Sequence, residues 1–472
     1  MTRQSDPQIS FADLEFLRHG VKLDPLLQAI SEFMERHAEP IEIVRRDLER
    51  GLKNPATGRN GLSARQVLRS LTLQRVKNWD YRELRERIAD GYTLRQFTDF
   101  YSRRVPKHDA FNRAFNRLTP GTLRAINDAI VQAALELGLE DGRKLRVDTT
   151  VVETDIHHPT DSTLLWDSVR VITRLVGRLD ELLPGAVGTF VKRTRSARRR
   201  MQEIQRMTPK QRHTQQLRKY RELIRTTGQV VRDARAVLQR TSKVRSIDPL
   251  SEGAIQELRK EIERHCGLGE RVIDQARRRV LENESVPNEQ KIFSIFETHT
   301  DLIKRGKVQK PVEFGHKVLL AESAKGLITQ YRVLNGNPID ETEVKPTLRR
   351  HVKIFGDAPE LFSADRGFFS YEIVKECHAA GVGLVCIPQR GGKKTPERQA
   401  YEKRRAFKNG QRFRAGIEGR ISVLFRGRGM KRCLAEGRER FEMLVGAAVL
   451  ASNLMVIAGL LAKKKQRHRA AA

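Results

Sequence analysis

The sequence predicts an α/β domain with a mixed sheet and flanking helices, interrupted by a long helical segment and preceded by an all-helical region. Three observations lead to this prediction. Residues 145–152 and the chain beyond about residue 292 read strand, hairpin, helix, strand, helix, strand, helix. Residues 161–290 instead carry heptad repeats of apolar residues. Residues 62–139 show helix caps and apolar stripes of helical period.

The charge balance identifies the class of partner. The chain has 472 residues, with 90 Lys plus Arg against 58 Asp plus Glu, and a formal net charge of +32. Such an excess raises the free energy of the compact state, so we expect a polyanionic partner whose phosphates neutralise it. The 39% hydrophobic content excludes a disordered chain. The four cysteines show no C-x-x-C spacing, which excludes a disulfide-rich secreted scaffold and indicates a reducing cytoplasm.

The N-terminal region is predicted to be a bundle of short helices. Ser63 with Gln66, and Asp80 with Glu83, have the spacing of a capping box. Thr119-Pro120 places a cap residue before a proline at the first helical position. A compact bundle with many surface arginines is a suitable module for binding duplex DNA, although no local motif proves a helix-turn-helix.

The first predicted strand of the α/β domain carries an acid on one of its faces. Leu145, Val147, Thr149 and Val151 alternate and share one face, which leaves Asp148 on the other.

Long helices are predicted after Pro159. Apolar residues repeat at heptad spacing from Leu165 to Leu183 and from Leu217 to Leu238, and a third stripe begins at Ile255. Between the first two, Lys192 to Tyr220 carries eleven Lys or Arg and one acid. A solvated linker face and an arm that follows DNA phosphates both fit this composition, and the charge of the whole chain favours the arm.

The C-terminal part returns to alternating strands and helices. We expect a hairpin from residues 314–320 and 327–334, helices at 340–354 and 371–380, and short buried strands at 361–364 and 384–387. An Arg-rich helix carrying Glu418 follows. The uncharged stretch Leu444–Ala462 is long enough to cross a bilayer, but its Ala, Gly, Ser452 and Asn453 favour a core helix.

Three acids stand out in this basic chain. Asp148 lies in a β-rich run, Asp365 ends a short apolar strand, and Glu418 lies in the Arg-rich helix. Taken singly, each acid fits a salt bridge with a nearby arginine. Brought together, three carboxylates would bind hard divalent cations such as Mg²⁺, and two such ions would suit phosphodiester chemistry.

At these acids the chain resembles a DDE transposase of bacterial insertion sequences, in a branch related to the ISNCY group. Three segments carry the resemblance, and each contains one acid: Val147-Asp148-Thr149-Thr150-Val151-Val152-Glu153 followed by His157-His158-Pro159, Ser363-Ala364-Asp365-Arg366-Gly367-Phe368, and Arg414-Ala415-Gly416-Ile417-Glu418-Gly419-Arg420. Asn453 also fits. The family signature has tyrosine and lysine where this chain has Gln411 and Phe425, and Arg426 or Arg428 could replace that lysine.

The resemblance implies an RNase H-like catalytic domain. We therefore expect a helical N-terminal DNA-binding domain at 1–140, the RNase H-like catalytic domain at 141–160 and 291–462, a basic coiled-coil-like helical insertion at 161–290, and a basic tail at 463–472. The implied catalytic and metal-binding triad is Asp148, Asp365 and Glu418. The expected DNA-binding residues are Arg414, Arg420, Arg426, Arg428 and Lys431.

The implied activity is cleavage at the ends of a DNA element and joining of the 3′-hydroxyl ends to target DNA. Two Mg²⁺ ions per active site are expected as cofactors, with Mn²⁺ as a substitute. The expected partners are double-stranded DNA and a second protomer or a higher oligomer, with no membrane, in the cytoplasm at the nucleoid. Two alternatives stay open, a non-catalytic repressor derived from a transposase and a structure-specific nuclease that cleaves without joining.

Overall fold

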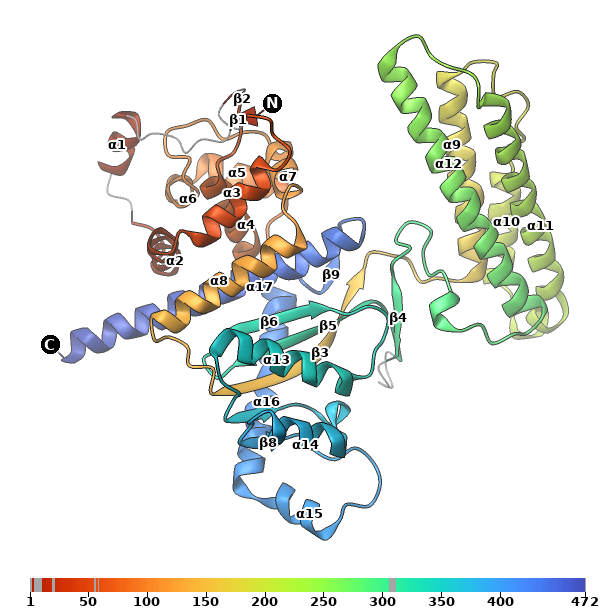
Figure 1. Ribbon diagram of the computed structural model, residues 1–472. Coiled ribbons are helices and arrows are strands. Elements are labelled where there is room, and N and C mark those ends of the chain that lie inside the picture. Colours follow the sequence, from red (N-terminus) through yellow and green to blue (C-terminus); the bar gives the residue numbers. More distant parts are fainter. Residues whose placement is uncertain are drawn as a thin grey trace. The chain divides into compact units, whose positions relative to one another are not determined.

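A computed structural model describes residues 2–3, 11–18, 22–54, 57, 59–304 and 311–471. The chain forms two compact units, one made of residues 1–153 and 316–472 and the other of residues 154–315. Figure 1 shows the elements of each unit. Ala472, the last residue of the predicted basic tail, lies outside the described residues.

Eight helices precede the sheet in the described part of the first unit. They are α1 (Phe11–Arg18), α2 (Pro25–Arg36), α3 (Glu39–Glu49), α4 (Ala64–Lys77), α5 (Tyr81–Asp90), α6 (Tyr92–Phe97), α7 (His108–Phe115) and α8 (Pro120–Glu136), with a two-residue parallel pair, β1 (Thr2–Arg3) and β2 (Arg59–Asn60). The predicted capping box of Ser63 and Gln66 is confirmed, and Asp80 caps α5. At the start of α8, Thr119 forms a capping box with Thr122.

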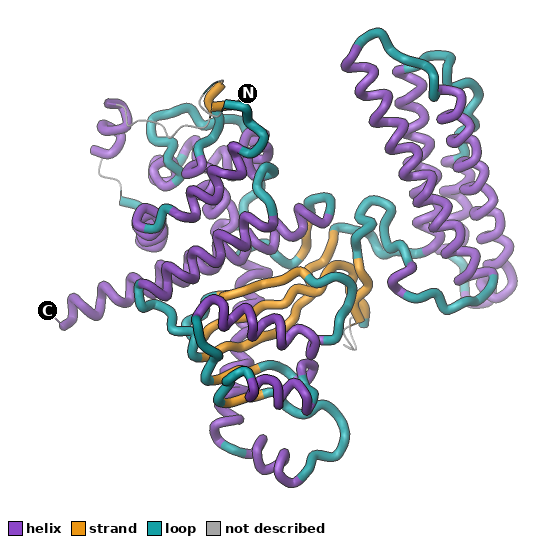
Figure 2. The backbone as a smooth tube through the Cα atoms, in the orientation of Figure 1, coloured by secondary structure: helices purple, strands orange, loops and turns teal. Residues whose placement is uncertain are grey.

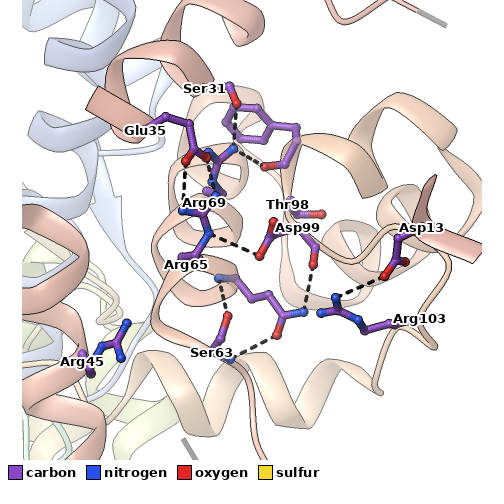
Figure 3. Close-up of polar contacts among 12 residues, drawn as sticks. Asp13, Ser31, Glu35, Arg45, Ser63, Arg65, Arg69, Thr98, Asp99 and Arg103 are labelled. Carbon is purple, nitrogen blue, oxygen red and sulfur yellow. Dashed lines mark hydrogen bonds and ion pairs between the residues drawn. The ribbon is translucent and has the colours of Figure 1, made fainter. Parts of the chain in front are cut away.

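Arginines in these helices serve the fold as well as the surface (Figure 3). Arg69 donates to Ser31 Oγ at 3.0 Å and to the Phe97 carbonyl at 2.8 Å, and its guanidinium pairs with Glu35. Arg65 pairs with Glu35 and also lies 3.4 Å from Asp99. These contacts join α2 and α4 to the end of α6, so part of the positive charge is neutralised inside the protein.

A mixed sheet of seven strands forms the centre of the α/β fold. Its strands are β3 (Lys144–Thr154), β4 (Asp301–Lys304), β5 (Val312–Ser323), β6 (Ile328–Val333), β7 (Leu361–Ser363), β8 (Leu384–Cys386) and β9 (Arg432–Cys433). The order is β4-β5-β3-β7-β8, with β6 on β5 and β9 on β3. β3, β7 and β8 run parallel, and β5 and β6 form the predicted antiparallel hairpin.

Helices cover both faces of this sheet, as Figure 2 shows by colour. On one face, Leu145 and Val147 pack with α13 (Val344–Phe355) and α14 (Tyr371–Ala379). On the other face, Val318 and Leu320 pack with α16 (Arg405–Ser422) and α17 (Arg438–Ala471). The helix predicted at 340–354 begins as a 3₁₀ turn, η3 (Asp340–Glu343). The remaining elements here are η4 (Arg366–Phe368), α15 (Pro396–Lys403) and the π-helical turn η5 (Val423–Gly427).

The apolar helix α17 is a core helix. By length and composition it could cross a membrane, but 72% of its most apolar window is buried inside the protein. Its polar Asn453 accepts from the Ile328 amide at 2.9 Å and donates to Asn127 Oδ1 at 2.8 Å. These bonds fix α17 to β6 and α8, and they explain a fully buried asparagine in an apolar helix.

The second unit is built mainly from four long helices. They are α9 (Asp161–Leu182), α10 (Thr194–Gln205), α11 (Pro209–Thr241) and α12 (Pro249–Ala276), followed by η1 (Arg277–Leu281) and η2 (Asn288–Gln290). The predicted seam from Leu165 to Leu183 is buried, as are Tyr220, Val231 and Ala234 of the second. Leu217, expected to begin the second seam, is instead 45% exposed, so packing starts one turn later.

Candidate active site

Asp148 lies on the face of β3 that α16 covers. This agrees with the predicted alternation, because its neighbour Val147 packs on the opposite face. The side chain is only 12% exposed and accepts a hydrogen bond from the Thr149 amide at 2.8 Å. The pKa of Asp148 is raised to about 6, mainly by burial. The charge of Arg414 lowers this pKa, and the nearby charges of Asp365 and Asp340 raise it.

Asp365 lies two residues beyond the end of β7, the parallel neighbour of β3. It caps η4 by accepting from the Gly367 amide at 2.7 Å. A Cβ atom at position 367 would lie 2.9 Å from Asp365 Oδ1 and 3.0 Å from Asp340 Oδ2. A side chain at position 367 would therefore require these two carboxylates to move.

Glu418 is carried by α16, which lies close against the sheet. At Gly410 a Cβ atom would lie only 2.8 Å from Cys386 Cβ on β8, so the absent side chain permits this approach. Arg146 also ties α16 to β3, since its Nη1 donates to the Phe413 carbonyl at 2.7 Å. The helix thereby presents its next turns, with Arg414 and Glu418, to Asp148.

Arg414 brings the three predicted acids together. Its Nη2 lies 2.8 Å from Asp148 Oδ2 and 3.9 Å from Asp365 Oδ2, and its Nη1 lies 3.1 Å from Glu418 Oε1. The Asp148 and Asp365 oxygens, both near Nη2, are therefore at most about 7 Å apart, close enough for the two carboxylates to hold ions that lie ~4 Å from each other. Asp365 is 38% and Glu418 68% exposed, so a substrate can reach this edge of the cluster.

A fourth acid, Asp340, was not predicted as a site residue. Its Oδ1 accepts from Thr149 Oγ1 at 3.0 Å and lies 2.8 Å from Lys317 Nζ. Lys317 is 8% exposed and also donates to the Pro338 carbonyl. In the sequence, Asp340 reads as the first residue of a helix, which is a common place for an acid. The ion pair with Lys317 could not be read from the sequence, because it forms only when the loop after β6 folds back over β5.

The arginines predicted to bind DNA divide into two groups. Arg420 is turned inward, with Nε 2.9 Å from Glu322, an acid with no exposed surface that also pairs with Arg146. Arg428 donates to the Val76 carbonyl at 2.8 Å. Protein acceptors therefore hold both of these guanidinium groups, and their contact with DNA stays a prediction. Arg426 and Lys431 are exposed, and Arg414 is held by the acids.

The donor chemistry of the cluster fits a divalent cation. Carboxylate oxygens are the ligands that Mg²⁺ prefers, and three of them surround a single positive group here. Within the described residues, no three His, Cys, Asp or Glu side chains already have the geometry of a metal site. The acids are arranged around the Arg414 guanidinium, so a metal ion would have to replace this contact.

Two segments of the chain match known protein families. Residues 293–454, which include Asp365 and Glu418, match the family described as Transposase DDE domain. Residues 16–117 match the family described as Transposase domain (DUF772). No curated protein and no solved structure matches the chain. The DDE family implies an RNase H-like domain, DNA as substrate and a general use of divalent metals. These two matches identify the chain as a DDE transposase of an insertion sequence, a metal-dependent enzyme that acts on DNA.

Proposed function

We propose that Asp148, Asp365 and Glu418 form the catalytic triad of this transposase. The observation that carries the proposal is their convergence, from β3, the end of β7 and α16, on the single guanidinium of Arg414. Each of these acids lies in one of the three segments that resemble the family motifs. The ISNCY-like branch stays a prediction.

The proposed reaction has two steps at the ends of the element. In the first, a water oxygen attacks the phosphorus, the bond to the 3′ oxygen breaks, and that oxygen leaves as a hydroxyl. In the second, this 3′-hydroxyl attacks a phosphorus of target DNA and displaces the 3′ oxygen of the target strand. A pair of Mg²⁺ ions held by the three carboxylates would supply Lewis-acid chemistry for both steps.

The residues of the chain divide the remaining tasks. Asp148 is the most enclosed ligand, and its environment disfavours the ionised form until a cation replaces lost hydration. Glu418 is the most exposed of the three acids and would lie nearest the bound DNA. Arg414 neutralises the acids in the resting protein, and its release would make a phosphate contact available. Arg426 and Lys431 would contact DNA phosphates, because both are exposed.

Bringing two ends together requires two copies of the active site, so we propose a homodimer or a higher oligomer as the active form. The N-terminal helices, matched by the second transposase family, would bind the element ends.

The variant Asp365→Asn tests this proposal. We expect it to abolish Mg²⁺-dependent cleavage of a duplex carrying the element end, while binding of that duplex in EDTA is retained. Retained cleavage, or loss of duplex binding in EDTA, would contradict the assignment. A strand-joining assay distinguishes the alternatives, since a nuclease would cleave without joining and a repressor would bind without cleaving.

A further inference from the structure

The helical unit at residues 154–315 has an unequal distribution of charge between its helices. α10 and α11 together carry thirteen Lys or Arg and three Asp or Glu. α9 and α12 together carry seven Lys or Arg and ten Asp or Glu. A bundle whose charges served only solubility would mix the two signs on all sides. The unit is therefore polarised, with a strongly basic helix pair.

The few acids of this pair are already used within the bundle. Glu203 lies 2.8 Å from Lys219, and Glu222 lies 3.1 Å from Arg200, so both acids join α10 to α11. Asp233 lies 2.8 Å from Arg193. The pairing leaves an outward set of cations. Arg195, Arg198, Arg206, Arg221 and Arg225 are exposed and make no ion pair with any residue in the described ranges; we call this set the basic face.

On α11, Arg221 and Arg225 of the basic face lie on the same side of the helix as Arg218 and Arg232. The four arginines follow one another at intervals of three, four and seven residues, which places them on one side. That side is opposite the buried Tyr220, Leu223 and Val230. A helix of 33 residues is about 50 Å long, roughly the rise of 15 base pairs of duplex DNA.

The composition of the basic face favours nucleic acid over protein as its partner. Arginine matches phosphate oxygens with two parallel hydrogen bonds. A protein interface would instead need an apolar centre. The apolar residues Ala197, Met201 and Ile204 of α10 are buried in the bundle. We infer that the basic face binds the sugar-phosphate backbone of duplex DNA without regard to sequence, an inference that rests on the proposed function because it needs DNA as the substrate.

The double variant Arg221→Gln/Arg225→Gln tests this inference in the full chain. Binding of a labelled 40-base-pair duplex of arbitrary sequence is measured in EDTA between about 50 and 300 mM NaCl. Each lost phosphate contact lowers the slope of log affinity against log salt by about 0.9, so we expect a decrease of about 2. Lys260→Gln/Arg271→Gln removes the same charge from exposed positions of α12 and serves as the matched control.

An unchanged slope in the α11 variant, or an equal decrease in the control, would overturn the inference. Loss of an oligomer in sedimentation with an unchanged slope would assign the basic face to a second copy of the chain instead. If the α11 variant does not fold, Arg195→Gln/Arg198→Gln gives the same test on α10. EDTA prevents cleavage, so these slopes do not depend on the catalytic triad. Cleavage by Asp365→Asn would overturn the triad and leave the slopes unchanged.

Discussion

Replacing Asp148 by asparagine should stabilise the metal-free protein at neutral pH. The pKa of Asp148 rises from 3.8 to about 6, chiefly through burial, so holding the carboxylate ionised costs free energy in the folded state. A shift of about two units corresponds to about 3 kcal/mol at most. Asparagine avoids this cost but gives Arg414 a weaker partner, so we expect a net gain of about 1–3 kcal/mol.

The sign of the pH dependence follows from the raised pKa. Between the ordinary value of 3.8 and the folded value of about 6, the folded protein binds more protons than the unfolded chain. Its stability therefore falls as pH rises through this window, and the full cost is present above pH 6. The advantage of Asp148→Asn should be complete at pH 7.5 and should disappear near pH 4.

Thermal unfolding in EDTA measures this difference. A gain of 1–3 kcal/mol should raise the Tm by about 2–8 °C for units of this size. Asp357→Asn is the matched control, because Asp357 is exposed and its neutralisation should change stability by less than about 0.5 kcal/mol. A lower Tm for Asp148→Asn at pH 7.5 would refute the reasoning, since the ion pair with Arg414 would then outweigh the cost of burial.

Three further variants test the positioning of the site. Glu418→Gln should leave the Tm unchanged, because Glu418 is 68% exposed, but should abolish Mg²⁺-dependent nicking of an element-end duplex. Gly410→Ala should lower the urea midpoint by the equivalent of about 1–3 kcal/mol, because its Cβ would meet Cys386; an unchanged midpoint would mean that α16 can shift. Asp340→Asn should destabilise the protein by about 1–3 kcal/mol by leaving buried Lys317 unpaired, and Asp340→Asn/Lys317→Met should recover part of this loss in a double-mutant cycle.

Much of the sheet could be predicted because apolar alternation reports burial directly. The hairpin of β5 and β6, the strands β7 and β8 and the helix α14 lie within a few residues of their predicted ranges. Residues 340–343 form a 3₁₀ turn, which the sequence pattern cannot distinguish from the start of a helix. The exposure of Leu217 could not be predicted either, since a heptad pattern shows which residues can pack against a neighbouring helix but not where that helix ends.

The acids of the site could be found from the sequence, but the ion pairs among them could not. Asp148 and Asp365 stand out because charged residues are rarely buried, and one lies within a largely apolar strand and the other just beyond one. Arg414 and Arg420 are both arginines of one helix, six residues apart. Arg414 contacts the proposed catalytic acids, and Arg420 contacts the buried Glu322. Their different partners depend on which side of α16 faces β3 and which faces β5, and this is decided by packing at Gly410 and Ile417.

The cost of keeping Asp148 ionised connects the stability of the fold to its function. Arg414 offsets only part of that cost, because the pKa of Asp148 remains raised although the guanidinium is 2.8 Å away. A divalent cation carries twice the charge and would remove more of it, so Mg²⁺ should raise the Tm of the wild type more than that of Asp148→Asn. Equal increments in the two proteins would show that the ion binds elsewhere, and would separate the buried acid from the metal site.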